Sequence, residues 1–177
     1  MGAHWTEDVG RLQPVLVVTQ FRADAQLITE QMRAFASTIV THWAQTGAAA
    51  LVKAAAHAPR LVFVEHPVED SAGLAFVRKL RRSSLSCREA PVIVLSSQPT
   101  LGAMREAQNA GAHEFLVRPF SAAQFARRLE VVIPPRPWIE TAVYVGPDRR
   151  RFNSAGELPG PDRRRGAGRH AKTPSAA

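Results

Sequence analysis

The chain has 177 residues, of which 45% are hydrophobic and 21% are charged, a composition typical of a globular domain rather than of disorder throughout. No apolar run approaches the roughly 18–20 residues that a membrane-spanning helix needs. The first residues, MGAHWTEDVGRLQ, lack the basic and apolar regions of a secretion signal. A single cysteine, Cys87, excludes an internal disulfide framework and a cysteine-rich zinc site. We therefore expect a soluble, cytoplasmic protein.

The distribution of charge indicates an anionic partner for the C-terminal part. Lys and Arg together number 23 against 15 Asp and Glu, and 20 of the 23 are arginine. Residues 1–133 have a net charge of +3, whereas the shorter segment 134–177 has +5. The planar guanidinium group of arginine makes bidentate hydrogen bonds and stacks on flat groups, whereas the lysine ammonium group is a point charge. An excess of arginine therefore favours an anionic partner.

Short apolar runs alternate with amphipathic stretches between residues 14 and 133. The predicted strands are 14–19, 37–44, 61–65, 91–97 and 114–117. The first predicted helix follows Asp24, which we expect to cap it. The other predicted helices cover 47–58, 74–82, 101–110 and 122–133. Five strand–helix repeats predict an α/β fold with a five-stranded, parallel, doubly wound sheet of the flavodoxin-like kind.

The rest of the chain divides by composition. We predict an N-terminal extension over 1–13, the α/β domain over 14–133, a proline-rich linker over 134–143 and an arginine-rich tail over 144–177. The tail has no hydrophobic period and is rich in Gly, Pro and Arg. Because ordering costs about 1–2 kcal/mol per residue, we expect the tail to be disordered until a ligand binds.

Residues 14–133 resemble the receiver domain of bacterial response regulators. The resemblance rests on LVFVE in the third strand, on Gly73 eight residues later, and on PVIVLSS and NAGAHEFLVRPF in the same order and spacing. It implies a phosphoacceptor carboxylate at the end of the third strand and an acidic pair that holds Mg²⁺. It also implies a hydroxyl and a cation for the phosphoryl oxygens, the cation followed by a cis proline bond.

This sequence departs from that receiver pattern at most of the implied positions. Thr19 and Gln20 stand in place of the acidic pair, Glu65 in place of the phosphoacceptor aspartate and Arg118 in place of the lysine. Ser96 keeps the hydroxyl. Without the acidic pair the site has few ligands for a hard divalent cation, so we predict no metal and no phosphotransfer. Two readings stay open for Glu65. It is either a fixed negative group that mimics the active state through Arg118, or half of an ion pair that closes an inactive pocket.

Enzymatic groups are not predicted elsewhere in the sequence. The six histidines form no i, i+4 metal-binding pair, and Ser96 has no His and Asp in a triad-like setting. We expect His66 to have a structural role and Phe115 to be a fixed core residue. The sequence thus predicts a non-enzymatic protein with no catalytic residue.

The tail contains a hexapeptide, GPDRRR, that occurs twice. The copies begin at Gly146 and Gly160, 14 residues apart. An aspartate beside three arginines weakens a contact with phosphate alone, but it can accept the N1–H and N2 amino hydrogens of guanine. Arginine pairs with the O6 and N7 atoms of guanine and stacks on its ring. The pattern therefore predicts a ligand with guanine and phosphate, read by Asp148, Arg149, Arg150, Arg151, Asp162, Arg163, Arg164 and Arg165.

A receiver with a degenerate phosphorylation site and an arginine-rich GPDRRR tail resembles the Cle family, CheY-like regulators whose tail binds cyclic di-GMP. That resemblance implies that the ligand orders the tail and promotes docking to a protein partner such as the flagellar motor switch, which tunes motility or attachment. Three alternatives remain from the residues. The tail could bind RNA or DNA non-specifically, it could lie on anionic lipid, or the receiver could accept phosphate.

Overall fold

The fold is centred on a parallel sheet of five strands. The structure is a computed structural model that describes residues 8–66 and 72–151. The sheet has the order β2-β1-β3-β4-β5, which confirms the predicted doubly wound architecture. Its strands are β1 (Val15–Val18), β2 (Thr41–Ala44), β3 (Leu61–Glu65), β4 (Val92–Ser96) and β5 (Glu114–Val117).

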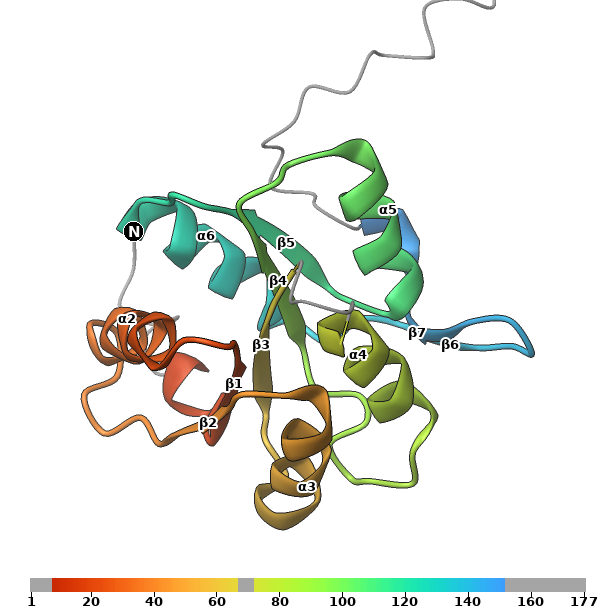
Figure 1. Ribbon diagram of the computed structural model, residues 1–177, viewed down its shortest axis with the longest axis horizontal. Helices are drawn as coiled ribbons and strands as arrows, with labels where there is room; N and C mark the ends of the chain where they lie inside the picture. The colour runs from red at the N-terminus through yellow and green to blue at the C-terminus, as the bar shows by residue number, and fades with distance from the viewer. Residues whose placement is uncertain (1–7, 67–71, 152–177) are drawn as a thin grey trace, which may run out of the picture.

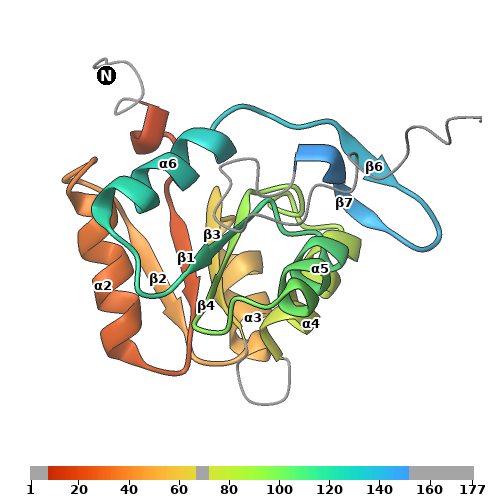
Figure 2. The same ribbon diagram turned by 90° about the horizontal axis from the view of Figure 1, so that it is seen from above.

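Helices cover both faces of the sheet (Figure 2). One face carries α2 (Arg22–Arg33) and α6 (Ala122–Val132), and the other carries α3 (Gly47–His57), α4 (Ala72–Arg82) and α5 (Leu101–Ala110). Successive side chains of β3 alternate between these two cores: Phe63 packs with the first and Val64 with the second. Apart from Glu65 and Ser96 at their carboxyl ends, the central strands β1, β3 and β4 are apolar, because each face of the sheet is buried. None of the helices in these ranges has the length and apolarity needed to cross a membrane.

Polar residues set the helix boundaries. The side chains of Thr46, Thr100 and Ser121 each accept a backbone N–H from the first turn of α3, α5 and α6. At the other end of α5, Gly111 adopts a φ of 96°, a left-handed conformation that suits glycine and ends the helix. These signals are local, which is why the predicted helix limits agree closely with the structure.

Two local predictions at the N-terminal half are wrong. The N-cap of α2 is Phe21, so Asp24 lies inside the first turn and does not cap the helix. The second strand begins at Thr41 rather than at residue 37, because the preceding residues form a turn in which the N–H of Ile39 bonds the carbonyl of Ala36. Its β-branched residues favour extended structure, but only 41–44 align with β1.

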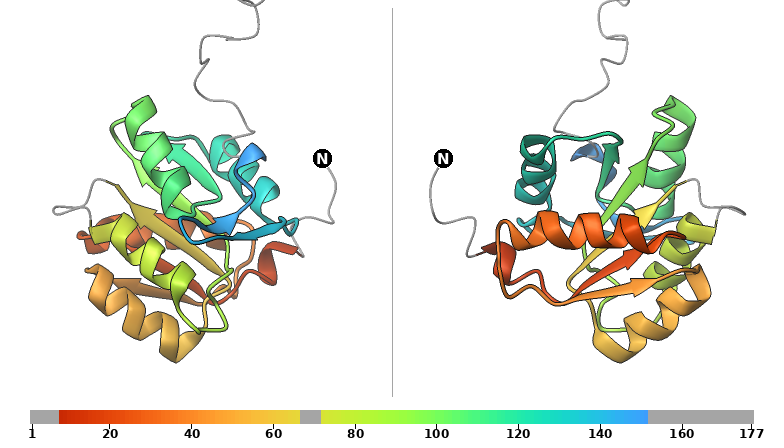
Figure 3. Two further views of the ribbon diagram at one scale, coloured as in Figure 1. Left: turned by 90° about the vertical axis from the view of Figure 1, so that its right-hand side faces the viewer. Right: turned by 60° about the vertical axis from the view of Figure 1, so that its left-hand side comes forward.

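The chain continues past α6 as an antiparallel hairpin that lies beside α4 and α5 (Figures 1 and 3). The hairpin consists of β6 (Trp138–Glu140) and β7 (Val145–Pro147) and is followed by the short 3₁₀ helix η2 (Arg149–Arg151). The composition of this segment predicts a linker and a disordered tail. Residues 138–151 are instead folded on the domain, and the rest of the predicted tail, 152–177, lies outside the described residues.

Candidate functional site

The carboxyl edge of the sheet gathers four of the five predicted pocket residues. Thr19 follows β1, Glu65 ends β3, Ser96 ends β4 and Arg118 follows β5. Side chains at this edge converge where the order of strands reverses, which is the usual position of a site in such sheets. The Arg118–Pro119 bond is cis, as the receiver resemblance implies.

Glu65 is held at both of its carboxylate oxygens. The hydroxyl of Thr19 donates to Oε2, and Nη1 of Arg118 donates to Oε1 at 3.1 Å. Thr19 is fully buried, and the side chains of Glu65 and Arg118 are 20% and 17% exposed. The carboxylate is therefore fixed in orientation and neutralised by a neighbouring cation.

Asp24 completes this pocket, although its sequence context predicts only a helix cap. Its Oδ1 lies 3.1 Å from the same Nη1 of Arg118, which therefore bridges two carboxylates from α2 and β3. An acidic residue in the first turn of the helix after β1 is the one signal that could have indicated it. Helix geometry places that turn over the carboxyl edge.

The donor set at this edge does not fit a divalent cation. Thr19 and Gln20 stand where the acidic pair is expected, and Arg118 already occupies both available carboxylates. A cation would have to displace this guanidinium to reach them. Residues 8–66 and 72–151 contain no cluster of three His, Cys, Asp or Glu side chains suited to a metal.

Ser96 is present but directed elsewhere. Its buried hydroxyl accepts the backbone N–H of Gln98 at 3.1 Å, so it caps the turn after β4. Phe115 is 1% exposed and packs in the core, as predicted. Burial lowers the pKa of His66, and the nearby carboxylate of Glu106 opposes this only in part. His66 is a buried ring that directly follows Glu65.

A second region of interest is the buried anchor of the hairpin. The carboxylate of Glu114 is fully buried and binds Nη2 of Arg136 at 2.7 Å and Nη1 of Arg128 at 3.2 Å. Arg136 also donates to the carbonyl of His113 at 2.9 Å. Burial raises the pKa of Glu114, and the two guanidinium groups oppose that rise. Arg136, which follows Pro134 and Pro135, is thereby fixed on β5.

The first GPDRRR copy begins in close backbone contact with the domain. A Cβ added at Gly146 would lie 2.6 Å from the Tyr144 hydroxyl and 3.0 Å from Cα of Gly111. Tyr144 is 5% exposed and donates to the carbonyl of Pro147 at 2.7 Å. Only glycine at 146 permits this approach. The Gly-Pro of this copy therefore serves docking.

The first arginine of the copy is also used for docking. Nη1 of Arg149 donates to Oδ1 of Asn109 at 2.9 Å, and the Arg149 carbonyl accepts the side-chain amide of Gln108 at 2.9 Å. Its guanidinium lies 4.5 Å from the ring centre of Tyr144. These contacts fasten η2 to the C-terminal end of α5.

Asp148 of this copy is half-buried, whereas Arg150 is exposed. Oδ1 of Asp148 accepts the backbone N–H of Arg150 at 3.0 Å, a turn that gives the aspartate a structural function which the sequence analysis missed. The side chain of Arg150 is 90% exposed. Asp148 and Arg150 line a cavity of about 280 Å³ together with Arg136 and Pro137. The second copy, with Asp162, Arg163, Arg164 and Arg165, lies outside the described residues, so the structure does not test it.

The family model described as "Response regulator receiver domain" matches residues 15–130. Among curated proteins, the chain is 34% identical over 90 residues to "Transcriptional regulatory protein KdpE" of Mycobacterium tuberculosis (strain CDC 1551 / Oshkosh). It is 33% identical over 90 residues to the KDP operon transcriptional regulatory protein KdpE of Escherichia coli (strain K12). Each alignment covers 51% of this chain and 38% of the relative, so the chain spans less than half the length of these relatives.

Solved structures show the same fold. The Vibrio cholerae chemotaxis protein CheY4 superposes with a TM-score of 0.60 at 22% identity, over 67% of this chain and 96% of that one. NtrX from Brucella abortus superposes with a TM-score of 0.59 at 25% identity, over 67% of this chain and 26% of that one.

Proposed function

The chain belongs to the response regulator receiver family of two-component signalling, and on this premise we propose that it is a non-enzymatic adaptor that responds to cyclic di-GMP through its GPDRRR copies. Ligand binding changes the surface that the protein presents to a partner, such as the flagellar motor switch. The observation that carries this proposal is the intact repetition of GPDRRR at Gly146 and Gly160. A symmetric ligand with two guanines and two phosphates matches two equivalent reading elements.

The mounting of the first copy on the domain supports the proposal energetically. Ordering a free segment of ten residues costs roughly 10–20 kcal/mol, which a few arginine–guanine contacts of about 1–3 kcal/mol each do not offset. Residues 144–151 are already fixed by Tyr144, Gly146 and Arg149. The ligand therefore does not have to order the first copy, which brings binding within reach of the available contacts.

The exposed groups of the first copy suit guanine recognition. Asp148 keeps Oδ2 outside its own turn, and Arg150 places an exposed guanidinium beside it. Arg136 also lines this cavity, and its side chain is 5% exposed because its N–H groups bind Glu114 and the His113 carbonyl. A purine that enters the 280 Å³ cavity would meet the Asp148 carboxylate and the exposed Arg150 guanidinium.

The receiver pocket of this adaptor does not transfer phosphate in our proposal. Arg118 bridges Asp24 and Glu65, and Thr19 holds the second oxygen of Glu65. The carboxylate is thus fixed beside a cation without any added group, an arrangement that keeps the domain in one state. Treatment with acetyl phosphate and Mg²⁺ should leave the protein unlabelled. Stoichiometric labelling that Glu65→Ala abolishes would support the phosphoaccepting alternative.

Calorimetric titration of the full chain with cyclic di-GMP tests the tail. Asp148→Asn is the informative variant, because the amide oxygen can still accept the Arg150 N–H while its NH₂ group repels the guanine donors. We expect at least tenfold weaker binding for Asp148→Asn and for Arg150→Ala. The matched control is Arg127→Ala, which removes an exposed arginine from α6 and should leave binding unchanged.

A generic cationic tail gives a different result. If Asp148→Asn binds cyclic di-GMP as well as the parent does, or if short single-stranded DNA binds with equal affinity and a steep salt dependence, the tail is a non-specific nucleic-acid contact. A pull-down of the motor switch with and without cyclic di-GMP then tests the partner. Ligand-independent capture would contradict the proposed response.

A further inference from the structure

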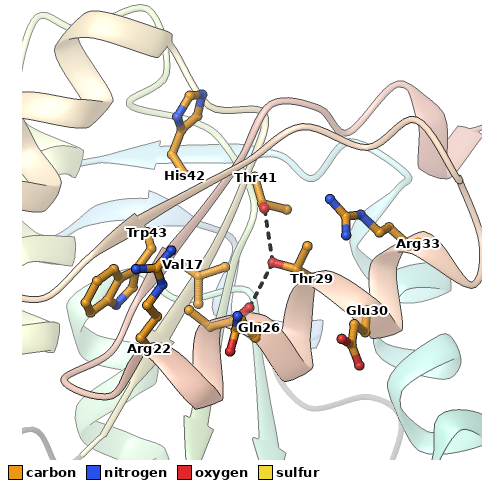
Figure 4. A pocket seen from close by; sticks show the side chains of 10 residues that line it. Val17, Arg22, Gln26, Thr29, Glu30, Arg33, Thr41, His42 and Trp43 are labelled. Atoms are coloured by element: carbon orange, nitrogen blue, oxygen red, sulfur yellow. Dashed lines mark hydrogen bonds between the residues drawn. The ribbon is translucent and has the colours of Figure 1, made fainter.

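A groove lies between α2 and the edge strand β2, next to the carboxyl-edge pocket that contains Thr19 and Asp24 (Figure 4). Its volume is about 420 Å³. Trp43 and Thr41 of β2 form one side, with the indole N–H fixed by the carbonyl of Thr19 at 2.9 Å. His42 points away from α2 and stacks on His57, with 3.7 Å between ring centres. The groove is therefore shaped by residues held in place.

The helix side of the groove is a polar stripe with a definite order of charge. Arg22 and Gln26 lie near Trp43, and Thr29 and Arg33 lie near the start of β2. Their spacing of four, three and four residues puts them on one face of α2. Cations therefore stand at the two ends of the groove, and the middle is uncharged apart from Glu30 on its rim.

The strand side of the groove is an open sheet edge. Among the described residues β2 pairs only with β1. The carbonyls of Val40 and Ala44 bond β1, at Val15 and Thr19. Residues alternate in a parallel strand, so the N–H and C=O groups of Thr41 and Trp43 point outward. An extended chain can hydrogen-bond to these groups as a sixth strand.

We propose that this groove binds an extended acidic segment of a partner protein, which pairs with the edge of β2 and places two carboxylates on Arg22 and Arg33. The rise along α2 between these arginines is about 16 Å at 1.5 Å per residue. Two side chains on the same face of a strand, four residues apart, are separated by about 13 Å. Flexible arginine side chains close the difference.

The middle of the groove determines which type of peptide residue can lie between the two acidic residues of the bound segment. The hydroxyl groups of Thr29 and Thr41 lie 3.0 Å apart in its floor, and Glu30 adds a negative charge to the rim. A third carboxylate at this point would be repelled, whereas a serine or threonine could bond the hydroxyl pair. The expected motif is therefore acid, any residue, Ser or Thr, any residue, acid, in an extended conformation.

Fluorescence polarisation with the full chain and fluorescein-labelled Glu-Val-Thr-Val-Glu-amide tests this proposal. We expect saturable binding that weakens at least tenfold in the double variant Arg22→Glu/Arg33→Glu and disappears when both peptide glutamates are replaced by lysine. The double variant Arg105→Glu/Arg127→Glu, on α5 and α6, makes the same change of net charge outside the groove and should leave the affinity within twofold. Equal weakening by this control would show attraction to net charge and overturn the proposal.

Backbone methylation tests the strand pairing separately. Alternate amides of a paired strand face β2, and the others face away. The first test peptide is N-methylated at both valines, and the second is N-methylated at the threonine and the last glutamate. We expect only one of these two peptides to lose binding. If both bind or both fail, the peptide does not pair with β2 and the proposal is wrong. Unchanged circular dichroism of the protein variants confirms that they are folded.

Discussion

Replacing Arg136 by methionine tests the claim that a buried ion pair holds the hairpin on the domain. Methionine keeps most of the aliphatic volume but removes both charge-assisted hydrogen bonds, to Glu114 at 2.7 Å and to the His113 carbonyl at 2.9 Å. The fully buried Glu114 carboxylate then keeps only one of its two cationic partners, Arg128. We expect the variant to fold with a loosened segment 136–151.

The magnitude follows from the cost of leaving a buried charge with too few partners. Removing one partner of a buried pair costs about 3–5 kcal/mol, and Arg128 retains part of the compensation. We therefore expect the free energy of unfolding to fall by about 3 kcal/mol. The pKa of Glu114, already raised by burial, should rise further.

Urea denaturation followed by circular dichroism measures the loss, and hydrogen exchange at the amides of Val145 and Gly146 reports the hairpin. The triple variant Arg136→Met/Glu114→Gln/Arg128→Met removes all three charges of this buried network and should recover at least 1 kcal/mol relative to Arg136→Met, because breaking a buried network from one side costs more than removing all of its charges. A loss below about 1 kcal/mol with unchanged exchange would refute the reasoning.

Three further predictions concern other parts of the structure. Gly146→Ala forces the Tyr144 ring to move, so exchange at residues 145–148 should rise and thermal stability fall, while Gly10→Ala, where a Cβ meets open space, serves as the control. Thr19→Val removes the hydroxyl that holds Glu65 and should lower the free energy of unfolding by about 1–3 kcal/mol in urea titrations, unless the carboxylate is not fixed there. Burial and neighbouring arginines hold the pKa of His113 well below 6.5, so the unfolded chain binds the extra proton first. Stability should therefore be fully present above pH 6.5 and fall by up to about 1.4 kcal/mol per pH unit below it, with a smaller slope in His113→Gln.

The pocket at the carboxyl edge shows how far residue identity alone reaches. The positions of Thr19, Glu65, Ser96 and Arg118 follow from strand ends, and these are predictable because each strand is a short apolar run between turn residues. The contact of Asp24 with Arg118 is not predictable in this way. It joins residues 94 positions apart, and it depends on how α2 crosses the sheet.

The C-terminal segment marks the same boundary more sharply. Its composition indicates disorder, since prolines, glycines and arginines bury little surface on their own. Glu114 reads as an ordinary polar residue at the start of a strand, yet it is fully buried and binds Arg136. A few long-range contacts of this kind outweigh the local preference of 138–151 and fold it on the domain.

The amino-acid order by itself determined the strand–helix alternation, the helix ends and the duplicated hexapeptide, because each depends on residues within a few positions of one another. Only the tertiary structure decided which charges are buried together and which arginines of the first copy are occupied. The physical reason is that the energy of a charge depends on its burial and on its neighbours in space. Both are set by the packing of the whole domain.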